Sequence, residues 1–129
     1  MSAGAQGRLK DREPLPLVDI GSNSVRLAVY EGIVRAPTVL FNEKILCGLG
    51  KGIADTGRLN QKAVDSALAA LKRFRALSVQ AGAKTMHVLA TAAAREAANG
   101  SAFIADAERI LRVTIRVLTG PEEAYFSAM

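Results

Sequence analysis

The sequence predicts an α/β fold in which helices pack on a mixed β-sheet. Short apolar segments with strand-like alternation fill residues 17–47, and segments with helical periodicity then alternate with further strands. Half of the 129 residues are apolar, which is enough for a buried core. We therefore expect one domain over residues 15–129, preceded by a flexible polar arm over residues 1–14.

The first predicted element is a β-hairpin around a polar turn. Strands are expected at residues 17–20 and 24–30, because apolar and polar side chains alternate in the second segment. Asp19 places a carboxylate just before the turn. The turn itself holds residue types that suit a tight bend and present N–H and hydroxyl groups, namely Gly21, Ser22, Asn23 and Ser24. Such donors suit a phosphate with its divalent cation, although an ordinary hairpin with a polar turn is the alternative.

A third strand is expected over residues 38–47, followed by a glycine-rich loop at residues 48–52. The loop is not a Walker phosphate loop, because Ile45 stands where the first glycine would be, and the Gly50-Lys51 pair is followed by Gly52 and Ile53 with no Ser or Thr. We predict a surface loop without a catalytic role, in which Lys51 could make an electrostatic contact.

A long amphipathic helix is predicted between Asn60, as its N-cap, and Gln80, with Gly82 as its stop. Its apolar residues recur at helical spacing and predict a core-facing stripe of Val64, Ala67, Leu68, Leu71, Phe74 and Leu77 or Ser78. Its basic residues are expected on the solvated face: Lys62, Lys72, Arg73 and Arg75.

The rest of the chain alternates strands and helices. A buried strand is expected at residues 84–90, in which His87 fits a core histidine better than a metal ligand. A helix follows from about residue 100 to 112, then a strand at 113–118, then a helix with Pro121 in its first turn. The predicted order is β-β-β-α-β-α-β-α.

Composition limits where the protein works and what it binds. Cys47 is the one cysteine, which excludes an internal disulfide, fits the cytoplasm and predicts a small buried or half-buried side chain. The N-terminus lacks a secretory signal, and no apolar run is long enough to span a membrane. The net charge is +5, from 17 basic and 12 acidic residues, and suits polyanionic partners.

Three segments resemble motifs of one family. Residues 19–27 (Asp-Ile-Gly-Ser-Asn-Ser-Val-Arg-Leu) are similar to the first phosphate motif of the exopolyphosphatase/guanosine pentaphosphate phosphohydrolase (Ppx/GppA) family. Residues 89–99 are similar to its "a-T-x-A-x-R-x-A-x-N" segment, and residues 119–124 to its "G-x-E-E-A" segment. The motifs occur in the family's order across nearly the whole chain. The resemblance implies a ribonuclease H-like lobe of the actin–Hsp70–sugar kinase superfamily.

The resemblance also implies roles for single residues. Glu123 corresponds to the proposed catalytic base, Arg95 to a phosphate contact, and the turn at residues 21–24 to a phosphate-binding loop. Asp19 would hold Mg²⁺ as the cofactor. Simpler explanations exist: Glu122 and Glu123 are favoured in a first helical turn, and Arg95 could form an exposed pair with Glu96.

The implied reaction is hydrolysis of a terminal phosphoanhydride in inorganic polyphosphate or guanosine pentaphosphate. A non-catalytic module that senses these ligands is the alternative, and a kinase of the same superfamily is a third. Family members carry a second phosphate motif, Asp-x-Gly-Gly-Gly-Ser, in a second lobe, and this chain has no Gly-Gly-Gly. We therefore expect the first lobe of a longer enzyme, inactive by itself. We expect no specific nucleic-acid partner, and a homodimer stays open.

Overall fold

The computed structural model describes residues 13–31 and 39–118. In these ranges five strands form one sheet in the order β3-β2-β1-β4-β5. They are β1 (Leu15–Ile20), β2 (Ser24–Tyr30), β3 (Val39–Leu46), β4 (His87–Ala90) and β5 (Arg116–Val117). β2 runs antiparallel to both of its neighbours, β1 and β3, whereas β4 is parallel to both β1 and β5. The mixed sheet that the sequence predicts is confirmed.

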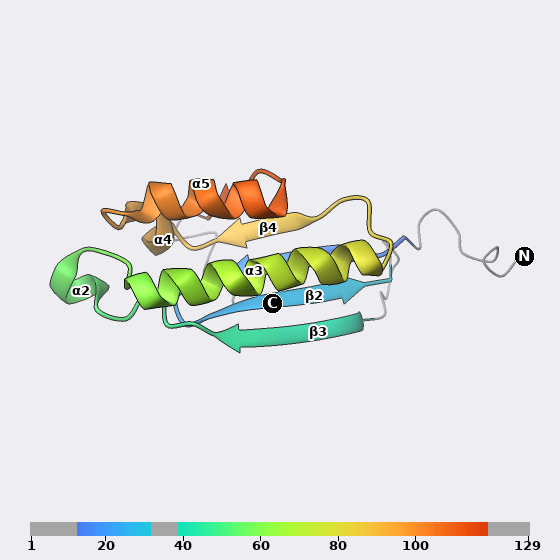
Figure 1. Ribbon diagram of the computed structural model, residues 1–129, viewed down its shortest axis with the longest axis horizontal. Helices are drawn as coiled ribbons and strands as arrows, with labels where there is room; N and C mark the ends of the chain where they lie inside the picture. The colour runs from blue at the N-terminus through green and yellow to red at the C-terminus, as the bar shows by residue number, and fades with distance from the viewer. Residues whose placement is uncertain (1–12, 32–38, 119–129) are drawn as a thin grey trace, which may run out of the picture.

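Four helices lie in the described ranges: α2 (Ile53–Thr56), α3 (Gln61–Gln80), α4 (Ala92–Glu96) and α5 (Gly100–Leu111). The long helix α3 packs against β2 and against α5, so these two helices form a layer over the sheet (Figure 1). The short helices α2 and α4 are absent from the predicted order, because four or five residues are too few to show a helical period. No helix in the described ranges is long and apolar enough to cross a membrane.

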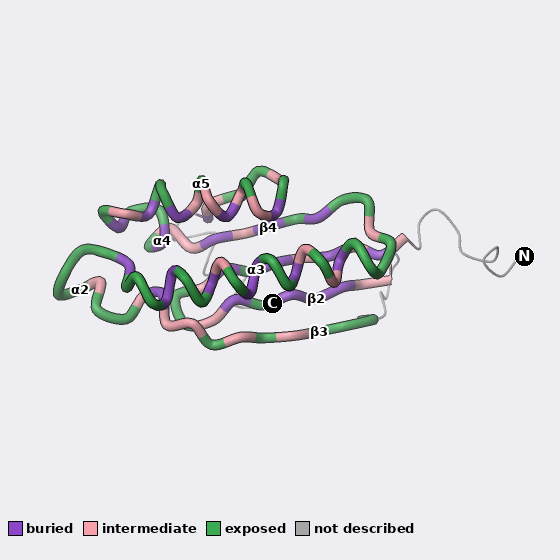
Figure 2. The backbone as a smooth tube through the Cα atoms, in the orientation of Figure 1, coloured by how far each residue is buried: buried purple, intermediate pink, exposed green. Residues whose placement is uncertain are grey.

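The core lies between the sheet and the two long helices (Figure 2). On the sheet side its buried residues alternate along each strand: Val18, Ile20, Val25, Leu27, Val29, Val88 and Ala90. On the helix side the predicted stripe of α3 is confirmed, with Leu71 and Phe74 fully buried and Leu68 and Leu77 half-buried. The opposite side chains of β1 and β2 therefore lie on the face away from these helices.

Capping confirms the predicted start of α3. The Asn60 side chain accepts a hydrogen bond from the Ala63 N–H at 3.0 Å, which satisfies one of the donors that a helix N-terminus leaves unpaired. The helix ends at Gln80, and Gly82 follows with φ of 87°. One prediction on this helix is wrong: Arg75 is half-buried rather than solvated, and its Nη1 donates to the Leu111 carbonyl of α5 at 3.0 Å.

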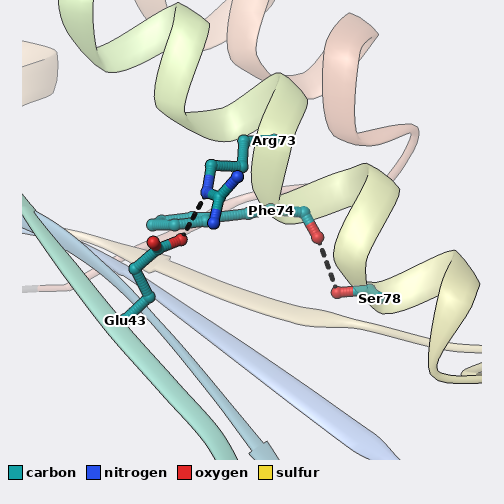
Figure 3. A network of polar contacts seen from close by, with 4 residues as sticks. All are labelled: Glu43, Arg73, Phe74 and Ser78. Carbon is teal, nitrogen blue, oxygen red and sulfur yellow. Dashed lines mark hydrogen bonds and ion pairs between the residues drawn. The ribbon is translucent and has the colours of Figure 1, made fainter.

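One polar contact joins α3 to the sheet and another lies within the helix (Figure 3). Arg73 Nε donates to Glu43 Oε1 of β3 at 2.7 Å, and this hydrogen bond, followed by the charge of Glu43, raises the pKa of Arg73. The buried Ser78 Oγ donates to the Phe74 carbonyl at 2.8 Å, so the one buried polar side chain in the described core has a partner.

Strand boundaries differ from the prediction in β1, β3, β4 and β5; β3 ends at Leu46, one residue early. β1 starts at Leu15, two residues early, and includes the buried Pro16; pairing with β4 begins only at Leu17, so this proline disturbs no bond on that side. β4 starts at His87 and β5 covers only Arg116–Val117.

The expectation of a core histidine is wrong. His87 is exposed, because it is the first residue of β4 and points opposite to the buried Val88. Cys47 is half-buried, as predicted. The expected helix at Pro121, with Glu123, lies outside the described residues.

Candidate functional site

The predicted phosphate turn closes the hairpin between β1 and β2. β1 ends at Ile20 and β2 begins at Ser24, and the Gly21 N–H donates to the Ser24 carbonyl at 2.9 Å. Ser22 and Asn23 at the tip are exposed, and Gly21 and Ser24 are half-buried. The turn therefore presents a hydroxyl and an amide side chain to solvent at one end of the sheet, a polar surface on which a phosphate could rest.

Asp19 lies beside this turn on the sheet face away from α3 and α5. It is exposed, whereas its neighbours Val18 and Ile20 point into the core. In the ladder it stands directly opposite Arg26 of β2, so the two side chains share a face. On its other side it is in register with Leu89 of β4. A carboxylate and a guanidinium thus lie next to the turn.

Sequence reasoning missed Arg26 as part of this face. Arg26 belongs to the motif at residues 19–27, but no function was predicted for its side chain. The signal was present, because strand alternation places Arg26 opposite the buried Val25 and Leu27, on the same face as Asp19.

The segment that carries Arg95 starts at the same edge of the sheet. The Thr91 N–H donates to the Ile20 carbonyl at 3.2 Å, which extends the β1–β4 pairing up to the turn. α4 follows at once, and its buried Ala94 lines one narrow pocket together with Gly21 and Ser22 of the turn. Arg95 is the next residue and is exposed. The structure therefore brings Asp19, the turn and the Arg95 segment together from two parts of the chain.

The glycine-rich loop at residues 48–52 packs against the turn through backbone hydrogen bonds. The N–H groups of Cys47 and Gly48 both donate to the Asn23 carbonyl at 3.0 Å, and the Gly50 N–H donates to the Ser22 carbonyl at 2.8 Å. Leu49 is buried with a relative exposure of 1%. The predicted surface loop is confirmed for Lys51 and Gly52, which are exposed, but not for the buried Leu49. The alternation of glycines with one leucine was the available signal, since it is typical of a loop that packs closely on other backbone.

Asn99 is a second residue whose part the sequence did not reveal. Its Oδ1 accepts from the Leu59 N–H at 2.8 Å and its Nδ2 donates to the Leu59 carbonyl at 3.1 Å. Nearby, the Ala98 N–H donates to the Gly57 carbonyl at 2.8 Å. These bonds hold the α2–α3 loop against the junction of α4 and α5.

The donor set around the turn fits a phosphate-bound cation rather than a metal held by protein alone. No group of three or more His, Cys, Asp or Glu side chains that could hold a metal occurs in residues 13–31 and 39–118. Asp19 supplies a single carboxylate beside the turn. Mg²⁺ is often bound through one or two carboxylates, with phosphate oxygens and water completing its six ligands, so this arrangement is compatible with Mg²⁺.

Comparisons with known proteins identify the family of this chain. The model of the Ppx/GppA phosphatase family matches residues 27–129, which is more than half of the chain. A guanosine-5'-triphosphate,3'-diphosphate pyrophosphatase of Aeromonas hydrophila is 30% identical over 107 residues; the match covers 83% of this chain and 22% of that relative. The chain thus spans less than a quarter of the length of this curated relative.

Solved structures give the same result. The Aquifex aeolicus member of the Ppx/GppA family superimposes with a TM-score of 0.79 at 25% identity, over 85% of this chain and 36% of that one. An exopolyphosphatase from Cytophaga hutchinsonii gives a TM-score of 0.78 at 29% identity, over 87% of this chain and 36% of that one. The ribonuclease H-like α/β prediction is confirmed, and the chain belongs to the Ppx/GppA phosphatase family.

Proposed function

We propose that this chain is the phosphate-binding lobe of a phosphohydrolase that removes the terminal phosphate of inorganic polyphosphate or guanosine pentaphosphate by Mg²⁺-assisted attack of water. The single observation that supports this most is the position of Asp19, the turn at residues 21–24 and the Arg95 segment at one edge of the sheet. Ligand sites of open α/β sheets gather at such edges. Membership of a phosphatase family supports the reaction class.

In this proposal each residue does one task. The guanidinium of Arg95 donates paired hydrogen bonds to the oxygens of the terminal phosphate. Ser22, Asn23 and Ser24 donate to the same phosphate. Asp19 would hold Mg²⁺, and the bound ion would offset part of the negative charge of the phosphate. Glu123, beyond the described residues, removes a proton from the attacking water as general base.

The proposal extends to the setting of the reaction. The single cysteine supports a reducing, cytoplasmic location. We infer little or no activity for this chain alone, because it lacks the second Gly-rich phosphate motif that the family resemblance implies.

The experiment measures phosphate release from polyphosphate and from guanosine pentaphosphate with Mg²⁺, in this chain and in the chain extended to the length of its relatives. We expect activity only in the extended protein. Phosphate release by the 129-residue chain would contradict the expectation of an inactive lobe.

A pair of variants in the extended protein then tests the general base. Glu123→Gln should lower hydrolysis by about 10²–10⁴-fold while ligand binding persists. Glu122→Gln, the matched control one residue earlier, should keep most of the activity. Absence of hydrolysis in the extended wild type, together with tight binding of either ligand, would replace this proposal with a sensing module.

A further inference from the structure

A groove with a mixed polar and apolar surface lies near the phosphate turn. It has a volume of about 290 Å³ and is formed by the α2 region, the start of α3 and the residue before α5, all at one end of the molecule (Figure 1). Its lining includes Lys51, Arg58, Asn60, Gln61 and Asn99.

The positive charge of this groove comes from two side chains. Lys51 and Arg58 are both exposed, and no Asp or Glu is among the lining residues. Within the described part of the chain neither cation takes part in an ion pair. An anionic ligand in the groove would therefore meet two cations and no carboxylate among the lining residues.

The lining amides are already used for structure. Asn60 Oδ1 caps α3 by accepting from the Ala63 N–H, and Gln61 Nε2 donates to Asp65 Oδ1 at 2.9 Å. Asn99 bonds to Leu59 through both of its polar atoms. These bonds hold the wall of the groove in place, so Lys51 and Arg58 project from a fixed surface.

The groove and the phosphate turn share one short segment. Gly50 donates to the Ser22 carbonyl, and the next residue, Lys51, lines the groove. Consecutive Cα atoms are about 3.8 Å apart, so the groove begins within one or two residue lengths of the turn. A ligand anchored at the turn could therefore enter the groove if it carried further negative groups.

The lining favours a phosphate chain over a nucleoside. It contains no aromatic side chain on which a base could stack, and its one apolar side chain larger than alanine, Leu59, is buried. Resting on the proposed function, we propose that this groove binds the internal phosphates of inorganic polyphosphate while the terminal phosphate lies at residues 21–24. Lys51 and Arg58 are the specificity-determining residues of this subsite.

The test is a titration of the ¹⁵N-labelled chain, followed by the amide NMR shifts, with tripolyphosphate and with polyphosphate of about 15 units. We expect the polyphosphate of about 15 units, but not tripolyphosphate, to shift the amides of Gly52, Gly57 and Asn99, and this shift should saturate. The double variant Lys51→Gln/Arg58→Gln should weaken the binding of the polyphosphate of about 15 units by about tenfold or more. Lys72→Gln/Lys84→Gln removes the same charge elsewhere on the surface and should change affinity less than twofold.

Two results would overturn the groove. The first is a titration with the polyphosphate of about 15 units that leaves these amide shifts unchanged. The second is an equal loss of polyphosphate affinity in the control variant Lys72→Gln/Lys84→Gln, which would reveal unspecific attraction to a basic protein. In the extended protein Lys51→Gln/Arg58→Gln should raise KM for long polyphosphate and leave KM for guanosine pentaphosphate unchanged. If the extended protein is active but the variant does not change the two KM values in this way, only the proposed role of the groove is refuted. If the extended wild type is inactive, the proposed function is refuted.

Discussion

Gly50 and Ser22 touch so closely that no other residue fits at position 50 without a shift. The Gly50 N–H donates to the Ser22 carbonyl at 2.8 Å, and a Cβ on residue 50 would lie 2.8 Å from the Ser22 Cβ. The glycine-rich loop therefore determines where the phosphate turn lies, although it belongs to a different part of the sequence.

Gly50→Ala should move the turn and destabilise the chain by about 1–3 kcal/mol, because the added methyl group overpacks this contact. The amide shifts of Ser22 and Asn23 and the midpoint of urea unfolding measure the two effects. Gly52→Ala is the matched control: no atom lies within 4 Å of its Cβ, and its φ of +84° costs roughly 1 kcal/mol of backbone strain without moving the turn. If the amide shifts of Ser22 and Asn23 were unchanged in Gly50→Ala, the loop would not hold the turn in position.

Gly100→Ala should displace α4 and with it Arg95. A Cβ at residue 100 would lie 2.0 Å from the Ala94 carbonyl oxygen and 2.6 Å from that of Arg95, both backbone atoms that yield little. We expect destabilisation of at least about 1–3 kcal/mol in urea and a shifted Arg95 amide. Ser101→Ala, at the exposed next position of α5, should stay within about 0.5 kcal/mol of wild type. Equal stability of the two variants would show that α4 accommodates the methyl group.

Asn99→Ala should cost about 1–3 kcal/mol of unfolding free energy, since it leaves the N–H and carbonyl of the buried Leu59 without their partner. Asn99→Asp should not restore stability, because its second carboxylate oxygen would face the Leu59 carbonyl. Thermal and urea unfolding measure both variants, with the exposed Asn42→Ala as control. If Asn99→Asp matched wild type, the donor half of this bridge would be unimportant.

Asp19→Asn in the extended protein should raise the Mg²⁺ concentration for half-maximal hydrolysis by about tenfold or more, because the amide is a weaker ligand than the carboxylate. A Mg²⁺ titration of phosphate release measures this. Asp65→Asn, an exposed carboxylate of α3 away from the turn, should leave the titration unchanged. Identical Mg²⁺ dependence in Asp19→Asn and wild type would remove Asp19 from the proposed metal site.

Local patterns of the sequence determined the elements that depend on neighbours in the chain. The hairpin around residues 21–24, the α3 cap at Asn60 and the buried stripe through Phe74 follow from alternation, capping chemistry and helical period. The same patterns, with the three motifs, were enough to predict the fold class and the family.

Only the tertiary structure decided which distant segments meet. The bond from Gly50 to Ser22, the bridge from Asn99 to Leu59 and the half-buried Arg75 join residues that are far apart in sequence, and no local period encodes such pairs. The exposed His87 was mispredicted for a related reason: whether the end of a strand is covered depends on what packs over it. Propensity and periodicity act over a few residues, whereas burial and the partners of backbone groups are properties of the packed chain.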